Sequence, residues 1–177
     1  MRRFPRMLVA DDDENDLRMI ARALPMEEPT YPVTFVHDGG EALDFIYGRG
    51  AFAQKGPERP GVLLLDLHMP RRNGWDVLRE IRRDEQMRHL PIVVFSSSDR
   101  EHDMRSCYDL GATAYVMKPV DPAAFRQTVA RIHAFWIGCN RLAGSAPPPL
   151  APAPAPVPAA RDRAPSRASG RQKAVTP

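Results

Sequence analysis

Residues 62–66 read Val62-Leu63-Leu64-Leu65-Asp66, four consecutive aliphatic residues followed directly by a carboxylate. A short, uninterrupted apolar run is typical of a strand that is buried on both faces of a parallel sheet. Such sheets bind their ligands at the carboxyl ends of the strands, which is where Asp66 stands. This stretch therefore predicts a buried parallel strand with a functional carboxylate at its end.

Four more short apolar runs lie on either side of this stretch, at residues 7–10, 33–36, 92–95 and 114–117. Segments that are expected to be helical follow the five runs, at residues 16–24, 40–47, 74–83, 100–110 and 122–136. Strands that alternate with helices form a parallel sheet covered by helices on both faces. We therefore predict an α/β protein with a five-stranded parallel sheet in a three-layer α/β/α sandwich.

Residues at several expected helix boundaries have the chemistry of caps. Asp99 and Asp121 precede two helical segments, so both are expected as N-caps, with Pro122 at a first helical position. Gly111 follows the segment 100–110, where a glycine commonly ends a helix.

The overall composition is that of a folded domain of ordinary size, with 177 residues, 43% hydrophobic and 27% charged. Two cysteines, Cys107 and Cys139, are too few for a disulfide-stabilised scaffold and fit a reducing compartment. No apolar run approaches the roughly 20 residues that span a bilayer. We therefore expect a cytoplasmic protein that does not enter a membrane.

Residues 143–177 differ from the rest of the chain, because they hold nine of its 19 prolines and a net charge of +4. Proline-rich, charged segments bury too little apolar surface to fold, so we predict a disordered tail there. The whole chain carries +3, which leaves residues 1–142 slightly acidic. The expected organisation is one domain at 1–142 followed by the tail, with no sequence-specific DNA binding.

Polar residues follow four of the five apolar runs, where the carboxyl ends of the predicted strands meet. They are Asp11, Asp12 and Asp13 after the first run, Asp66 after the third, Ser96 after the fourth and Lys118 after the fifth. Clustered carboxylates repel one another, and hard oxygen ligands without a histidine or cysteine cluster favour Mg²⁺. Magnesium beside an ammonium and a hydroxyl predicts phosphoryl chemistry. Each residue also has a purely structural explanation when it is taken alone: Asp12 and Asp13 could serve merely to cap the first helix, and Lys118 could be a surface charge.

These residues also resemble a known family. Asp11-Asp12, the segment Asp66-Leu67-His68-Met69-Pro70 with Gly74 downstream, Ser96, and Lys118-Pro119 are similar in order and spacing to the landmarks of the receiver domain of two-component response regulators. The resemblance extends over residues 6–137. It implies a flavodoxin-like fold with strand order 2-1-3-4-5.

The resemblance also implies roles for individual residues. Asp66 would accept a phosphoryl group from a sensor histidine kinase. Asp12 and Asp66 would bind Mg²⁺ directly together with the backbone carbonyl of His68, and Asp11 would act mostly through water. On the phosphorylated protein, Lys118 would pair with the phosphoryl oxygens and Ser96 would donate a hydrogen bond to one of them. Tyr115 occupies the position of the family's aromatic switch residue.

A narrower resemblance concerns the segment Glu41-Ala42-Leu43-Asp44-Phe45-Ile46-Tyr47 and the run Phe135-Trp136-Ile137. Both are similar to the stand-alone regulators that pair with phytochrome-type histidine kinases. Three consecutive large apolar residues exceed what one helical stripe buries, so at least one should face outward. We expect either a homodimer through this corner and the segments 100–110, 114–117 and 122–136, or residues 138–142 folded over it.

Two other functions remain open at this point. An Mg²⁺-dependent phosphohydrolase of the haloacid dehalogenase type would also use Asp66 as a nucleophile, but it places a second aspartate where this chain has His68. A degenerate receiver would bind proteins without being phosphorylated, although Asp66, Ser96 and Lys118 are all present. The interpretation favoured by the residues is a phosphoacceptor signalling protein rather than an enzyme.

Overall fold

The fold was determined from a computed structural model, which describes residues 7–24 and 32–140. The predicted tail, and residues 1–6, 25–31 and 141–142 of the predicted domain, lie outside the described residues. The five strands form one parallel sheet in the order β2-β1-β3-β4-β5, which confirms the predicted fold class. Their bounds are β1 Met7–Ala10, β2 Val33–Val36, β3 Val62–Leu65, β4 Ile92–Ser96 and β5 Ala114–Met117.

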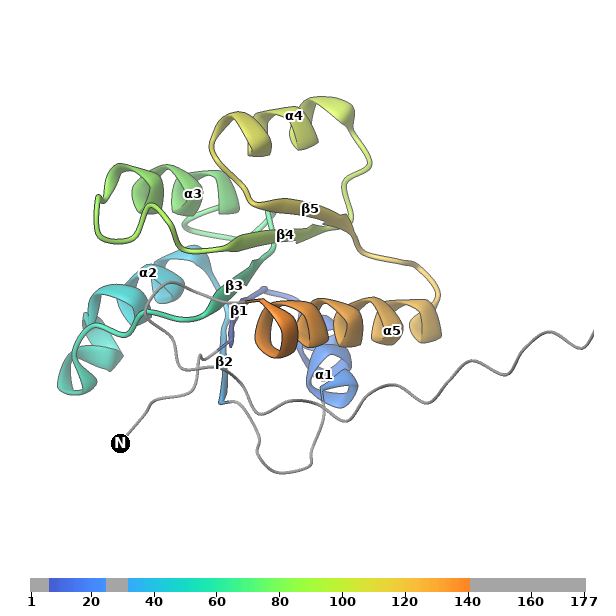
Figure 1. Cartoon of the computed structure of the whole chain (residues 1–177), viewed down its shortest axis with the longest axis horizontal. Helices are drawn as coiled ribbons and strands as arrows, with labels where there is room; N and C mark the ends of the chain where they lie inside the picture. The colour runs from blue at the N-terminus through green and yellow to red at the C-terminus, as the bar shows by residue number, and fades with distance from the viewer. Residues whose placement is uncertain (1–6, 25–31, 141–177) are drawn as a thin grey trace, which may run out of the picture.

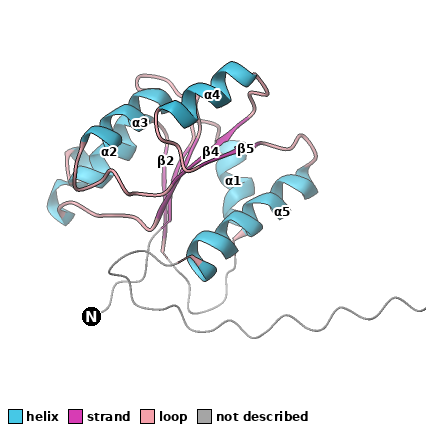
Figure 2. Ribbon diagram, turned by 45° about the horizontal axis from the view of Figure 1, so that its top comes forward, coloured by secondary structure: helices cyan, strands magenta, loops and turns pink. Residues whose placement is uncertain are grey.

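Helices cover both faces of the sheet, as Figures 1 and 2 show. The pair α1 and α5 packs on one face, and α2, α3 and α4 lie on the other (Figure 2). The helices are α1 Glu14–Ala23, α2 Gly39–Tyr47, α3 Gly74–Arg83, α4 Glu101–Asp109 and α5 Pro122–His133. A 3₁₀ helix, η1 Gly50–Lys55, lies between α2 and β3, and a π-helical turn, η2 Ala134–Cys139, follows α5.

The central strand β3 shows why these runs are apolar without interruption. Leu63 and Leu65 belong to a core cluster with the inner sides of α2 and α3. Val62 and Leu64 point the other way, into a second cluster with α1 and α5. Because alternate side chains of a strand face opposite sides, a sheet covered on both faces needs apolar residues at every position.

The helix boundaries agree with the predicted caps, including Gly111 with φ 90° after the C-cap of α4, except at the start of α4. Asp121 accepts a hydrogen bond from the Ala124 N–H as the N-cap of α5, and Pro122 is the first helical residue. Asp99 does not cap α4, because its N-cap is Arg100, which makes no side-chain cap. The Ser98 hydroxyl, 3.4 Å from the Arg100 nitrogen, lies at this end of the helix instead.

The end of α5 also differs from the prediction. The α-helix stops at His133 rather than at Trp136, and the chain continues in the π-helical turn. Ile137 is buried, Trp136 packs partly against the core, and Phe135 is 53% exposed. One of the three large residues therefore faces outward, as expected. Within residues 7–24 and 32–140, no helix combines the length and apolarity that a membrane crossing requires.

Candidate functional site

The predicted site residues lie at the carboxyl edge of the sheet, except Tyr115, which is the second residue of β5. Asp11 and Asp66 come directly after β1 and β3, Ser96 is the last residue of β4, and Lys118 follows β5. The Asp11 N–H donates to the Val36 carbonyl and the Asp66 N–H to the Ala10 carbonyl, at 3.1 and 2.9 Å. Backbone hydrogen bonds between neighbouring strands thus hold both aspartates in the frame of the sheet.

Three carboxylates form a cluster with the dimensions of a cation site. One oxygen from each of Asp11, Asp12 and Asp66 lies within 4.8 Å of the other two. Asp11 and Asp66 are buried, whereas Asp12 is exposed. Carboxylate oxygens suit hard divalent cations, so this acidic triad has the chemistry of a divalent metal site.

Lys118 supplies the positive charge of the site. Its Nζ lies 2.8 Å from Oδ2 of Asp11 and 3.3 Å from Oδ1 of Asp66. Burial alone would lower the pKa of Lys118, but the charges of Asp66 and Asp11 more than offset this and raise it. The ammonium therefore stays protonated, and the interpretation of Lys118 as an isolated surface charge is wrong.

A third carboxylate on Lys118 was missed by the sequence reasoning. Oδ2 of Asp16, in the first turn of α1, lies 2.8 Å from the same Nζ. The sequence did contain a signal for Asp16: it follows soon after β1, whose last residue is Ala10, and residues just after a strand are candidates for this site. Asp13, in contrast, has the structural role that its position allows. It caps α1 by accepting a hydrogen bond from the Asn15 N–H.

The Asp11 carboxyl resists ionisation in the metal-free site. Burial raises its pKa to about 6, and the Asp66 charge adds to this, while Lys118 and the Asp13 N–H act in the opposite direction. A bound cation would offset the desolvation and the repulsion together, because it brings positive charge among the carboxylates.

The loop after Asp66 is held close to the site. The His68 N–H donates to Oδ2 of Asp66 at 2.9 Å, and the Gly74 N–H donates to the Leu67 carbonyl at 3.0 Å. A Cβ on Gly74 would lie 2.5 Å from the Asp66 carbonyl oxygen, so this close approach requires glycine. The rings of His68 and Trp75 meet edge to face at 5.2 Å, which brings a tryptophan next to the acidic site.

Ser96 and Tyr115 lie on neighbouring strands beside the site. Ser96 is fully buried, and its Oγ accepts a hydrogen bond from the Ser98 N–H at 3.3 Å. The Tyr115 hydroxyl donates to the Ser98 carbonyl at 2.8 Å. The Ser98 hydroxyl in turn donates to Asp103 of α4 at 2.6 Å. One short loop thus connects Ser96, Tyr115 and α4.

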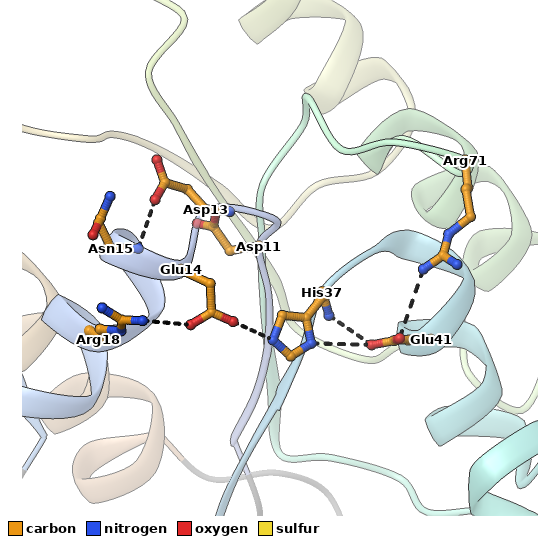
Figure 3. A network of polar contacts seen from close by, with 8 residues as sticks. All are labelled: Asp11, Asp13, Glu14, Asn15, Arg18, His37, Glu41 and Arg71. Carbon is orange, nitrogen blue, oxygen red and sulfur yellow. Dashed lines mark hydrogen bonds and ion pairs between the residues drawn. The ribbon is translucent and has the colours of Figure 1, made fainter.

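Charged residues on the rim connect the loops around the triad (Figure 3). His37 lies between Glu14 of α1 and Glu41 of α2, with ring nitrogens 3.0 and 3.5 Å from the two carboxylates. Arg71 adopts a left-handed backbone with φ 62° and pairs with Asp38, the buried N-cap of α2. These contacts tie the β3–α3 loop to the start of α2.

A doubly wound sheet with an acidic triad and a lysine at its carboxyl edge defines the class of phosphoacceptor signalling domains called receivers. Residues 7–130 match the response regulator receiver domain, and the chain belongs to this family. The metal chemistry of the triad, the fold and the family agree with one another.

Several solved structures and relatives resemble the chain over most of their own length. The phosphorylated cyanobacterial phytochrome response regulator RcpA shares 31% identity and a TM-score of 0.73, covering 78% of this chain and 97% of that one. The bacteriophytochrome response regulator RtBRR shares 37% and a TM-score of 0.64, covering 82% and 85%.

The third relative is the response regulator Rcp1 of Synechocystis sp., 28% identical over 131 residues, which cover 74% of this chain and 88% of Rcp1. The structure of its Mn²⁺-bound form has a TM-score of 0.72 at 27% identity, covering 78% and 98% of the two chains.

Proposed function

We propose that Asp66 is the phosphoacceptor of this response regulator and that Lys118 and Ser96 assist the transfer. The observation that carries the proposal is the Lys118 ammonium 3.3 Å from Asp66, at the edge of a triad able to hold a divalent cation. A phosphoryl group on Asp66 would meet positive charge from two directions, which favours transfer by electrostatic stabilisation.

The transfer makes one bond and breaks one. A carboxylate oxygen of Asp66 attacks the phosphorus of a phosphohistidine on the kinase and forms an acyl phosphate. The P–N bond breaks, and its electron pair returns to the imidazole, which recovers a proton from solvent. Lys118 and the Ser96 hydroxyl bind the phosphoryl oxygens, and no other nucleophile is needed.

The metal that we propose is Mg²⁺, held by Asp12, Asp66 and the His68 carbonyl, with Asp11 acting through water. An all-oxygen site that must also accommodate phosphate oxygens suits magnesium, which keeps several waters and few protein ligands. The Mn²⁺-bound form of Rcp1 supports a divalent cation in a related site.

The signal that follows phosphorylation is proposed to pass through Ser96 and Tyr115. Movement of Ser96 toward the phosphoryl group would disturb the Ser98 loop, where both Tyr115 and Asp103 are bonded. Burial raises the pKa of Tyr115, so its hydroxyl remains a hydrogen-bond donor at neutral pH. The start of α4 would therefore respond to the state of Asp66.

The proposed donor is a phytochrome-type sensor histidine kinase, because RcpA and RtBRR are phytochrome response regulators by name. Residues 1–142 would form the receiver, followed by the tail from residue 143. We also propose a cytoplasmic location, which the two free cysteines and the proposed kinase donor support.

A homodimer is proposed through α4, β5, α5 and the Phe135-Trp136 corner. Exposed large apolar side chains occur on or beside this surface: Tyr108 on α4, Met117 on β5, Val120 in the loop before α5, and Phe135 at the corner. Exposed apolar groups favour association, and a two-fold dimer would bury the same patch on both copies.

The test of the phosphoacceptor is incubation with acetyl phosphate and Mg²⁺, followed by intact mass and phosphate release. The proposal expects one phosphoryl group per chain, lost by Asp66→Asn. Continuous phosphate release without a lasting adduct would indicate the phosphohydrolase. No adduct and no release would indicate the degenerate receiver.

A further inference from the structure

We propose that Asp16 is a positioning residue that holds the Lys118 ammonium in place for phosphoryl transfer. The inference rests on the proposed function, since it concerns the same lysine. Its basis is the 2.8 Å contact between Oδ2 of Asp16 and Nζ of Lys118, a contact shorter than the one to Asp66.

An ammonium carries three N–H donors, and three carboxylates surround this one. Asp11 and Asp16 both lie at 2.8 Å, while the phosphoacceptor lies at 3.3 Å. Two short contacts fix the orientation of the group, and the remaining donor then points toward Asp66. Asp16 thus helps to determine the position of the Lys118 ammonium.

Asp11 cannot fill this role alone, because its oxygens are already shared. Its Oδ1 accepts from the Asp13 N–H at 3.1 Å and its Oδ2 binds Lys118, and both oxygens belong to the carboxylate of the metal triad. A cation in the triad would compete with Lys118 for Asp11. Asp16 lies outside the triad, and among the described residues its carboxylate has no ion-pair partner other than Lys118.

The support of Asp16 is rigid and partly shielded from water. Asp16 sits in the first turn of α1, three residues after the Asp13 cap, and α1 packs on α5. The side chains of Asp16 and Lys118 are 18% and 11% exposed. Solvent screens such a pair less than it screens a surface ion pair.

The experiment compares phosphorylation by acetyl phosphate at saturating Mg²⁺ in wild type, Asp16→Asn, Asp16→Glu and Glu14→Gln. Glu14→Gln is the matched control, because it removes one negative charge from the same helical turn without a contact to Lys118. Mg²⁺ affinity is measured alongside by fluorescence, which separates metal binding from the transfer step.

We expect Asp16→Asn to phosphorylate about five- to tenfold more slowly, with its Mg²⁺ dissociation constant within about twofold of wild type, because a misplaced group costs rate rather than binding. Asp16→Glu should recover part of the rate, and Glu14→Gln should match wild type. An Asp16→Asn rate equal to or above the control overturns the inference. A parallel loss of Mg²⁺ affinity also overturns it, since Asp16 would then belong to the metal site. A wild type that accepts no phosphoryl group defeats the proposed function itself, which is a separate result.

Discussion

The Lys118 ammonium lies 2.8 Å from the Asp11 carboxylate although 107 residues separate the two along the chain. The pair joins the carboxyl ends of β1 and β5, which are not neighbours in the sheet. The pair thus spans the strands between these two ends and brings the Lys118 ammonium among the carboxylates of the site. The balance between these charges sets the behaviour of the metal-free protein.

Asp11→Asn should stabilise the metal-free protein at neutral pH. The Asp11 pKa of about 6 lies above its ordinary value of 3.8, so the native state binds the proton more tightly and loses stability as the pH rises through 6. Asparagine does not ionise, so the variant does not lose stability in this way as the pH rises. Its free energy of unfolding at about pH 7.5 should exceed that of wild type by about 1–3 kcal/mol. Urea unfolding in EDTA would measure the difference.

The stability difference between the two proteins should depend on pH. Below about pH 4 wild-type Asp11 is protonated in both states, so the advantage of the variant should vanish there. An Asp11→Asn protein that is no more stable than wild type at neutral pH would contradict the assignment. Adding Mg²⁺ should reverse the order, because the metal stabilises wild type more.

Asp12→Ala should weaken Mg²⁺ binding first and phosphorylation only as a consequence. Removing one of the two carboxylates proposed to bind the metal directly costs affinity, whereas Asp66 keeps its nucleophilic oxygen. Trp75, whose ring meets His68 at 5.2 Å, is the expected reporter of a fluorescence titration. Trp75→Phe should abolish the fluorescence change without altering the affinity measured by calorimetry.

Gly74→Ala should destabilise the fold by about 1–3 kcal/mol, because overpacking forces the backbone to move. The added methyl would lie 2.5 Å from the Asp66 carbonyl oxygen and 2.9 Å from the Leu67 Cα. Gly138→Ala is the matched control, since nothing lies within 4 Å of a Cβ there. Equal thermal midpoints for the two variants would show that the loop tolerates the methyl.

Cys139 and Cys107 should differ strongly in reactivity toward iodoacetamide. Cys139 is exposed, whereas Cys107 is fully buried, and burial together with the charge of Asp103 raises its pKa to about 11. Only the thiolate reacts quickly, so about one thiol per chain should be alkylated in the native protein at about pH 8. Mass spectrometry of the peptides would identify it. Rapid labelling of Cys107 would mean that α4 opens readily.

Phe135→Ala should weaken the proposed homodimer without lowering the stability of the subunit. Phe135 is 53% exposed, while Trp136 packs against the core, so Trp136→Ala should cost stability as well as association. A central interface side chain contributes more than about 1 kcal/mol, or roughly fivefold in dissociation constant. Sedimentation velocity would measure both variants. A wild type that stays monomeric at tens of micromolar, with and without a phosphoryl mimic, removes the dimer.

The sequence by itself determined the sheet and the position of its functional edge. Apolar runs such as Val62–Leu65 identify strands because a central strand covered on both faces is buried along its length. Asp66 follows its strand directly, so the local pattern that predicts the strand also predicts that Asp66 lies at the functional edge. The five strands and the gathering of Asp11, Asp66, Ser96 and Lys118 were predictable for this reason.

The tertiary structure decided what depends on side-chain packing between distant segments. The contact of Asp16 with Lys118 and the edge-to-face contact of His68 with Trp75 require the relative placement of helices and loops, which no local pattern encodes. The switch to a π-helical turn after His133 and the missing Asp99 cap likewise reflect competition between backbone hydrogen bonds and long-range packing. Intrinsic helix propensities contribute less free energy than tertiary packing does, so packing of the core determines where each helix begins and ends.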